Sequence, residues 1–444
     1  GANTMGIAFT GTGAITKRDG GTWRLTGSNT HSGGTTINGG VLELNAASAS
    51  WNVGIFGGTA TINNGGTMKI LGGNNTGSAN TVNVNGGGTL EFTQSWNTAG
   101  AGSTYLGTIN LSSASGTAAT VNGIGATRMG YNANGTITST GATANTFSAG
   151  LLFVNNGTFT VTISPATGNT LNFTGMMSDH DGLAGTTLFK TGGGTMILAS
   201  GNTRNGANRL QAGTTEVSNT SAFGNGGYLG LEQDATLRYT GAGTQTDGRT
   251  LWIDQGTQAK TIEIVNAAAN LVFTSNAGNV NKPVTKTGAG TITIADDINS
   301  GAALTVSAGT FRIGNLGANG NLASGASAAV STGANLEFAN SGSITIGGGL
   351  SGAGTIRFQG TGVSGQSSYT LGGTSTHTGA IVVDEARITL DNATDVGSAS
   401  MITVNSGAGV DVIGGTIAWP ITISGNGWTE PSGDLGAIRM SAGT

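Results

Sequence analysis

Three histidines and one dense group of titratable residues are the side chains best suited to chemistry. The histidines are His31, His180 and His377. Asp179, His180 and Asp181 are adjacent, and they form a dense group of titratable residues. This group could ligate a metal ion, but adjacent residues rarely converge on one ion, and no cysteine or further histidine lies nearby. We therefore expect no metal site.

The other candidates for chemistry favour a structural role. His31 and His377 occupy equivalent positions in two repeated segments, so we expect them at corners of the fold. Enzymes that cleave polysaccharides need two or three carboxylates on one face, whereas most acids here stand alone. Glycine runs such as residues 86–88 lack the Lys-Ser/Thr ending of a phosphate-binding loop. We expect no catalytic residue, no cofactor and no enzyme activity.

The charged side chains show an order that a solvated surface does not require. Many stand in the middle of an apolar-x-apolar segment, where the alternation of a strand turns them to solvent. Their sign changes at all seven steps within three runs: Arg24, Glu43, Lys69, Glu91; Glu216, Arg238, Glu263; and Arg312, Glu337, Arg357. Stacked strands bring such neighbours to about 4.8 Å, where opposite charges attract. The pattern predicts a charge ladder that fixes register, since an exposed pair contributes at most about 1 kcal/mol.

The elements that position these residues recur along the chain. Two short strands joined by a polar Gly/Ser/Asn/Thr corner span residues 17–44, 190–217 and 286–313. Each time, the closing residues of the two strands lie 19 positions apart: Leu25 and Leu44, Leu198 and Val217, Ile294 and Ile313. A degraded fourth copy keeps the spacing from Leu371 to Leu390. The chain is therefore a repeat protein.

The spacing predicts a parallel coil in which each turn stacks on the previous one. Residues 82–84 and 90–92 are typical of two strands around a tight Asn-Gly corner, because Asn and Gly accept a positive φ. A hairpin would pair such strands antiparallel, and it would leave the spacing of about 19 to 26 residues unexplained. One circuit per spacing explains it. We expect a longer loop to leave the coil at residues 125–149.

Composition supports the coil and excludes other classes. Of the 444 residues, 83 are glycine, none is cysteine and 9% are charged, with a net charge of −4. A solenoid escapes the size limit of a single core, and Val, Ile, Leu, Ala and Thr suit stacked strands. No basic run could neutralise phosphates, so nucleic-acid binding is disfavoured, and no apolar stretch approaches the roughly 20 residues of a membrane helix. The lack of cysteine suits bacterial proteins that cross an oxidising periplasm.

A family resemblance follows from the repeat itself. The run K-x-G-x-G-T-φ-x-φ, then G-x-N-T-x-S-G-x-T-x-φ and G-x-φ-x-φ (φ, apolar), resembles the autotransporter-associated β-strand repeat. Residues 17–44 carry it most fully, and residues 190–217 and 286–313 more loosely. His31 and His377 stand where the family often has Tyr. The resemblance implies a right-handed parallel β-helix on the surface of Gram-negative-type bacteria.

We therefore predict an all-β chain without significant helix: a right-handed parallel β-helix of about 20 rungs. It forms a single continuous solenoid over residues 1–444, with less regular, loop-rich rungs around residues 93–178. The predicted function is a non-enzymatic, extracellular structural or adhesive segment of a surface fibre, filament or autotransporter-like passenger. The expected partners are copies of the chain stacked end to end, flanking solenoid sequence, and cell-surface glycans.

Two alternative functions remain open at this point. One is a polysaccharide-binding or -cleaving spike of the phage-tailspike kind, which clustered carboxylates in a groove would favour. The other is ice binding through Thr-x-Thr segments, and it ranks last. The threonines that suggest it fall in different phases of the repeat, so no flat threonine array is expected: Thr136, Thr158, Thr160 and Thr291.

Overall fold

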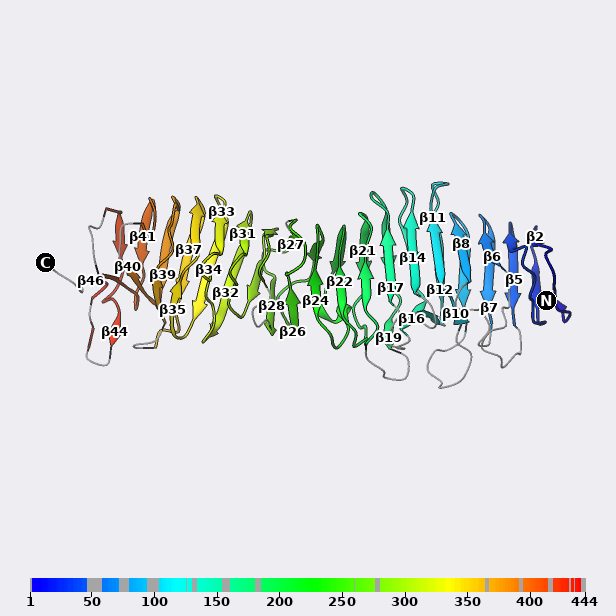
Figure 1. The fold of residues 1–444 in the computed structure, drawn as a ribbon, viewed down its shortest axis with the longest axis horizontal. Helices are drawn as coiled ribbons and strands as arrows, with labels where there is room; N and C mark the ends of the chain where they lie inside the picture. Colours follow the sequence, from blue (N-terminus) through cyan, green and yellow to red (C-terminus); the bar gives the residue numbers. More distant parts are fainter. Residues whose placement is uncertain are drawn as a thin grey trace. The chain divides into compact units, whose positions relative to one another are not determined.

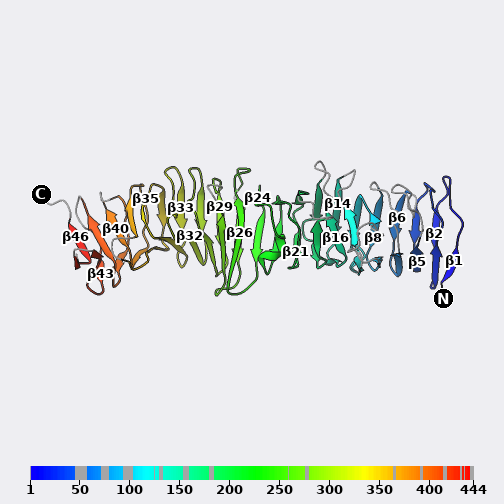
Figure 2. The ribbon, with the colours of Figure 1, turned by 90° about the horizontal axis from the view of Figure 1, so that it is seen from below.

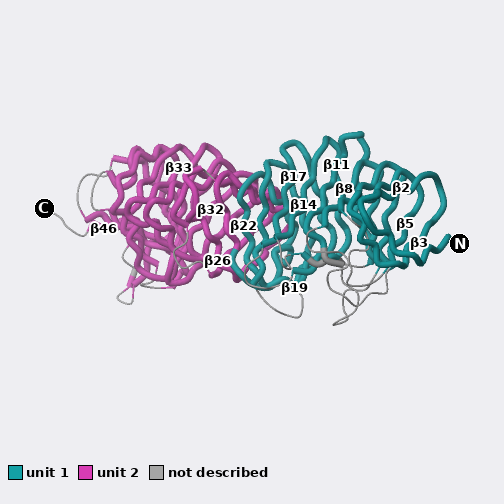
Figure 3. Tube along the Cα trace, turned by 45° about the vertical axis from the view of Figure 1, so that its right-hand side comes forward, with its two compact units in different colours: residues 1–228 teal, residues 229–444 magenta. Residues whose placement is uncertain are grey.

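The chain forms two compact units, Gly1–Tyr228 and Leu229–Thr444, which Figure 3 distinguishes by colour. Both are built almost entirely from short β-strands. The computed structural model describes residues 2–45, 58–71, 80–93, 104–124, 126–129, 134–153, 160–179, 185–258, 260–275, 280–363, 367–390, 394–413, 418–430, 433–434 and 436–440.

Unit 1 contains three parallel sheets, whose strands lie side by side in Figures 1 and 2. The first consists of β1 (Asn3–Met5), β3 (Thr22–Leu25), β5 (Gly40–Leu44), β7 (Gly66–Ile70), β9 (Thr89–Phe92), β12 (Thr120–Gly123), β15 (Asn145–Phe147), β18 (Thr170–Phe173), β21 (Thr195–Leu198) and β23 (Thr214–Val217). The second consists of β2 (Ile15–Lys17), β4 (Thr35–Ile37), β6 (Thr59–Ile62), β8 (Thr81–Asn85), β11 (Thr108–Ser112), β14 (Gly135–Thr140), β17 (Val161–Pro165), β20 (Leu188–Lys190) and β22 (Asn208–Leu210). The third consists of β10 (Thr104–Tyr105), β13 (Ala126–Met129), β16 (Gly150–Phe153) and β19 (Met177–Asp179).

Unit 2 repeats this plan. Its first sheet consists of β25 (Thr236–Tyr239), β27 (Lys260–Ile264), β29 (Val284–Thr287), β31 (Ala303–Val306), β33 (Ser327–Val330) and β36 (Gly349–Gly352). Its second consists of β24 (Leu229–Leu231), β26 (Thr244–Trp252), β28 (Asn270–Ser275), β30 (Thr291–Ile294), β32 (Thr310–Gly317), β34 (Asn335–Asn340), β37 (Thr355–Gln359), β39 (Ala380–Asp384), β41 (Met401–Val404) and β43 (Ile421–Ile423). Its third consists of β35 (Ser343–Ile346), β38 (Ser368–Leu371), β40 (Arg387–Leu390), β42 (Gly409–Val412) and β46 (Ile438–Met440), and a small antiparallel pair joins β44 (Thr429–Glu430) to β45 (Gly433–Asp434).

The strands stack in parallel with the register that the repeat spacing predicts. The closing residues that lie 19 positions apart are Cα partners on neighbouring strands in all four copies: Leu25 and Leu44, Leu198 and Val217, Ile294 and Ile313, Leu371 and Leu390. The expected strand at residues 82–84 falls in β8, which pairs in parallel with β6 and β11. The 19-residue spacing is therefore one circuit of the coil, each repeat segment contains strands of two successive turns, and the hairpin alternative is wrong.

The parallel β-helix is confirmed with small corrections. Nine strands follow one another in the second sheet of unit 1 and ten in that of unit 2, slightly fewer turns than the expected figure of about 20. The described residues contain one helical segment, the single 3₁₀ turn η2 (Thr220–Phe223). The continuity of the solenoid over the two units and its right-handedness stay predictions.

Residues 125–149 differ from the expected loop. Residues 126–129, 135–140 and 145–147 form β13, β14 and β15, and each of these strands pairs in parallel with neighbouring turns. The sequence pattern is weak here because the strands are short and separated by Gly and Asn, yet the backbone remains in the coil. Residues 125 and 130–133 lie outside the described parts of the chain.

Apolar side chains inside each unit stack on similar side chains of the next turn. Ile37, Ile62, Val84 and Leu111 follow one another in register and are at most 1% exposed. Full burial of such a side chain contributes about 1.5–3 kcal/mol. Phenylalanine rings stack in the same way, with centroids 4.6 Å apart in the pair Phe147 and Phe173, and 5.3 Å apart in the pair Phe338 and Phe358. The stacked columns are the core.

The charge ladder is present on the outer face of the strands. Arg24, Glu43, Lys69 and Glu91 are Cα partners on β3, β5, β7 and β9. Arg24 Nη2 lies 2.7 Å from Glu43 Oε2, and Lys69 Nζ lies 3.0 Å from Glu91 Oε1. In unit 2, Arg238 lies 2.7 Å from Glu263 and Arg312 lies 3.1 Å from Glu337. Register and charge order therefore agree.

A charge reversal at Lys69 tests the energetic meaning of this ladder. Lys69→Glu would place three acids in one column, so we expect a lower melting temperature at low salt and a destabilisation on the order of 1 kcal/mol. Thermal unfolding followed by circular dichroism at low and high salt measures the effect, and added salt should recover most of it by screening. Lys69→Gln is the neutral control. If Lys69→Glu melts like the wild type at low salt, the ladder has no energetic role.

Candidate functional site

The structure places both described histidines in the interior. His31 is 2% exposed, and its Nε2 lies 3.0 Å from Thr35 Oγ1. His377 is 0% exposed, and its Nε2 lies 3.4 Å from the carbonyl oxygen of Ala380. Burial lowers the pKa of both imidazoles, which favours their neutral forms. Their contacts are those of corner residues.

Asp179 is the only member of the predicted Asp-His-Asp group that the structure describes, since His180 and Asp181 lie outside the described residues. Its Oδ2 accepts a 2.6 Å hydrogen bond from the backbone N–H of Asn205. Burial raises the pKa of this carboxyl, and that hydrogen bond opposes the shift. Over the described ranges of the chain, no three or more His, Cys, Asp or Glu side chains are grouped so that they could hold a metal ion.

A buried lysine occupies the same position in all three repeats. Lys17 Nζ donates at 2.7–2.9 Å to the backbone carbonyls of Arg18, Asp19 and Gly39. Lys286 Nζ donates at 2.6–3.1 Å to those of Thr287, Gly288 and Ala308. Lys190 Nζ donates at 2.9 and 2.6 Å to those of Gly192 and Ala212. Each ammonium therefore joins the corner after its own strand to the equivalent corner one turn further on.

Sequence reasoning missed this role of the lysines. A buried ammonium is costly unless its protons are hydrogen-bonded, and here carbonyl oxygens surround it. Burial lowers the pKa of Lys286 to about 8, while the Glu263 carboxylate opposes the shift. A signal was nevertheless present in the sequence. Lys17, Lys190 and Lys286 each lie at the end of a short strand segment, and each lies eight positions before the residue that closes the next strand.

A glycine of left-handed conformation completes each lysine corner. Gly40, Gly213 and Gly309 lie 23 positions after their lysines and have φ of 66°, 63° and 65°. A Cβ on Gly309 would lie 2.4 Å from the carbonyl oxygen of Gly290 and 2.5 Å from that of Gly288. Only glycine leaves the carbonyls that surround the lysine in place.

Buried polar side chains also hold the opposite corner. Asn29 Oδ1 accepts the backbone N–H of Phe9 at 3.0 Å, and the equivalent Asn202 Oδ1 accepts that of Met177 at 2.7 Å. Each asparagine therefore bonds to the preceding turn. Asn29 lies in the G-x-N-T part of the motif, and Asn202 lies in the looser copy Gly201-Asn202-Thr203. The sequence alone did not reveal that they are buried, with exposed fractions of 0% and 2%.

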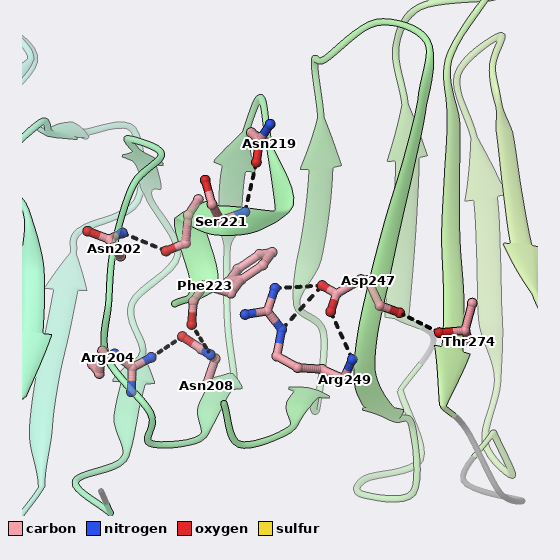
Figure 4. A network of polar contacts seen from close by, with 10 residues as sticks. Asn202, Arg204, Asn208, Asn219, Ser221, Phe223, Asp247, Arg249 and Thr274 are labelled. Carbon is pink, nitrogen blue, oxygen red and sulfur yellow. Dashed lines mark hydrogen bonds and ion pairs between the residues drawn. The ribbon is translucent and has the colours of Figure 1, made fainter. Parts of the chain in front are cut away.

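Arg204 stands where the first repeat has His31 and makes an equivalent contact. It is 1% exposed and donates to Asn208 Oδ1, four positions on, as His31 contacts Thr35 (Figure 4). Asn208 in turn donates at 3.0 Å to the carbonyl of Phe223. The guanidinium carbon lies 4.9 Å from the ring centroid of Phe153. Different side chains therefore satisfy the same buried corner.

A column of threonines lies on the outer face of the second sheet of unit 1. Neighbouring turns place five threonines in register: Thr59, Thr81, Thr108, Thr136 and Thr162. This is a single column rather than a flat array, because the next outward column contains Asn83 and Asn110. Thr160 is out of phase with Thr136 as predicted, and Thr158 lies outside the described residues. The signal was a threonine at the first or second position of successive strands, rather than the Thr-x-Thr segment. The next column joins Asn83, Asn110 and Thr138 by hydrogen bonds of 2.9 and 2.7 Å.

An added methyl group at Gly309 tests the lysine corner. Gly309→Ala should destabilise unit 2 by about 2–4 kcal/mol, since its Cβ meets two backbone oxygens and its φ is positive. Chemical denaturation followed by circular dichroism measures the change. Gly333→Ala is the matched control, with a φ of 80° but no atom within 4 Å of the added carbon, and should cost about 1 kcal/mol. Equal losses in the two variants would mean that the carbonyl cage does not matter.

The described residues contain no helix with the length and apolarity needed to cross a membrane.

Comparisons with known proteins identify the repeat. The family model of the passenger-associated-transport repeat matches residues 15–44, 188–217 and 284–313, the same three segments that the 19-residue spacing defines. Over 274 residues, the chain is 29% identical to the adhesin BmaC autotransporter of Brucella suis biovar 1 (strain 1330). That match covers 58% of this chain and 7% of the relative, and no solved structure matches. The chain carries three passenger-associated-transport repeats, which confirms the autotransporter passenger repeat family predicted from its sequence.

Proposed function

We propose that the chain is an adhesive, non-enzymatic segment of an extracellular autotransporter passenger displayed on a bacterial surface. The observation that carries the proposal is the set of three passenger-associated-transport repeats, each of which contains strands of two successive turns stacked in parallel. The similarity to an autotransporter adhesin supports it, although the chain spans only 7% of that protein's length.

The chemistry of the outer face suits adhesion. Thr, Asn and compensated ion pairs present hydrogen-bond donors and acceptors with little net charge, as Thr136, Thr138 and the pair Arg24–Glu43 illustrate. Regular stacking repeats each group about every 4.8 Å. Such a surface can form many weak contacts at once, and multivalency converts weak contacts into firm attachment.

We also propose that another solenoid turn covers the end of unit 1 that begins with β1. An apolar hollow of about 300 Å³ lies there, lined in part by Met5, Phe9, Ile15 and Trp23. Trp23 is 39% exposed although its Cα partner Leu42 is 2% exposed. A parallel turn from flanking sequence or from a second copy would bury this surface and pair with the edge strand.

Attachment of coated beads to epithelial cells tests the adhesive function. Beads that carry the folded chain should attach several-fold more often than beads that carry the heat-unfolded chain, because the stacked surface exists only in the folded coil. Microscopy counts the attached beads. Enzymatic removal of surface glycans distinguishes a glycan receptor from a protein receptor. Equal attachment of folded and unfolded chains would contradict the proposal.

Sedimentation velocity over a range of concentrations tests the covered end. The wild-type chain should self-associate as its concentration rises, and Trp23→Lys should reduce this association because it places a charge in the apolar hollow. Ile124→Lys is the control, since Ile124 is 77% exposed and does not line the hollow. A monomer at all concentrations, or equal association of both variants, would overturn stacking by a second copy and leave flanking sequence as the covering turn.

A further inference from the structure

A polar hollow in unit 2 is lined by none of the corner residues described above. It occupies about 570 Å³ on the outer face of β32, β34, β37 and β39, which are neighbours in Figure 1. Arg312, Glu337 and Arg357 line it from successive turns, in register as Cα partners. Gln359 and Asp384 line it from the next pair of register partners. This volume lies within the range of about 300–1,000 Å³ that is usual for small-ligand pockets.

Two ion pairs compensate four of the five charged side chains that line the hollow, and the fifth, Glu385, leaves a net charge of −1. Arg312 Nη2 lies 3.1 Å from Glu337 Oε1 and 3.2 Å from Oε2. Arg357 Nη1 forms an ion pair with Asp384 Oδ2, and Asn405 Nδ2 donates to Asp384 Oδ1. The carboxylates of Glu337 and Asp384 are therefore occupied by donors of the protein. Each arginine already has a carboxylate partner, so an anion would compete with an existing ion pair, and Glu385 is the one lining carboxylate outside these two pairs.

Free hydrogen-bonding groups remain beside these pairs. Arg357 is 41% exposed at its side chain, and its Nε and Nη2 make no hydrogen bond within the described residues. The side chains of Gln359 and Glu385 likewise have no hydrogen-bond partner in the parts of the chain that the structure describes. The hollow therefore offers fixed N–H donors next to free oxygen acceptors.

We propose that this hollow binds a neutral sugar of a cell-surface glycan. Each sugar hydroxyl both donates and accepts, which matches the alternation of guanidinium donors with the oxygens of Gln359 and Glu385. The volume of the hollow is on the order of that of one or two sugar rings. The Asp384–Asn405 contact holds Arg357 in place, so its free N–H groups are oriented before the sugar arrives. The inference rests on the adhesive function proposed above and assigns a ligand class to one of its surfaces.

Ligand-detected NMR with defined sugars tests the site on the full chain. The probes are the neutral disaccharides lactose and maltose, with galacturonic acid and glucosamine as charged comparisons. We expect at least one neutral probe to bind weakly, and Arg357→Met to reduce its affinity about tenfold or more. Asp384→Asn should also weaken binding, because it releases the arginine. Circular dichroism checks that each variant is folded.

Arg238→Met is the matched control, because Arg238 forms a similar ion pair with Glu263 at 2.7 Å but does not line the hollow. It should leave sugar binding unchanged. No binding of either neutral sugar, stronger binding of galacturonic acid or glucosamine, or equal binding by Arg357→Met and the wild type would overturn the inference. Beads that attach to cells while no sugar binds would contradict this inference alone, and sugar binding without bead attachment would contradict the adhesive function alone.

Discussion

In-register stacking of parallel turns is the constraint on which the rest of the structure depends. A side chain at one position of a turn meets the side chain one circuit away at about 4.8 Å, inside the coil and outside it. Identical or complementary residues must therefore follow one another along each column. Ile62 and Val84 satisfy this rule in the core, Asn63 and Asn85 at a corner, and Lys69 and Glu91 on the surface.

Corners impose a second constraint, because the backbone turns inward and leaves polar groups without a strand partner. Buried polar groups are costly unless they are hydrogen-bonded. The repeat meets this cost with Lys17, Lys190 and Lys286 beside left-handed glycines, and with Asn29 and Asn202 at the opposite corner. The repeat motif therefore consists of residues that satisfy the backbone polar groups at the corners, and the strands between them need only an apolar side chain at each inward position.

The sequence predicted the coil, the circuit length and the charge order, because these depend on spacing along the chain. The 19-residue interval from Leu25 to Leu44 translates directly into a register pair. It did not predict that β13 to β15 remain in the coil, since short strands between Gly and Asn carry little pattern. The polar hollow beside Arg357 and Asp384 was also missed, because it depends on side chains from turns of unequal length that spacing alone does not place together.

Disulfide trapping tests the in-register coil most directly, because the chain has no cysteine of its own. Thr61 and Asn83 are Cα partners on β6 and β8, 22 residues apart, whereas the side chain of Asn85, two residues further on, donates a hydrogen bond to that of Asn63. Stacked turns place partner Cα atoms about 4.8 Å apart, within disulfide reach, and move the offset pair beyond about 7 Å. Mass spectrometry after mild oxidation should find a disulfide in the variant Thr61→Cys/Asn83→Cys and little in Thr61→Cys/Asn85→Cys. Equal yields in both variants, or a disulfide only in the offset pair, would contradict the account.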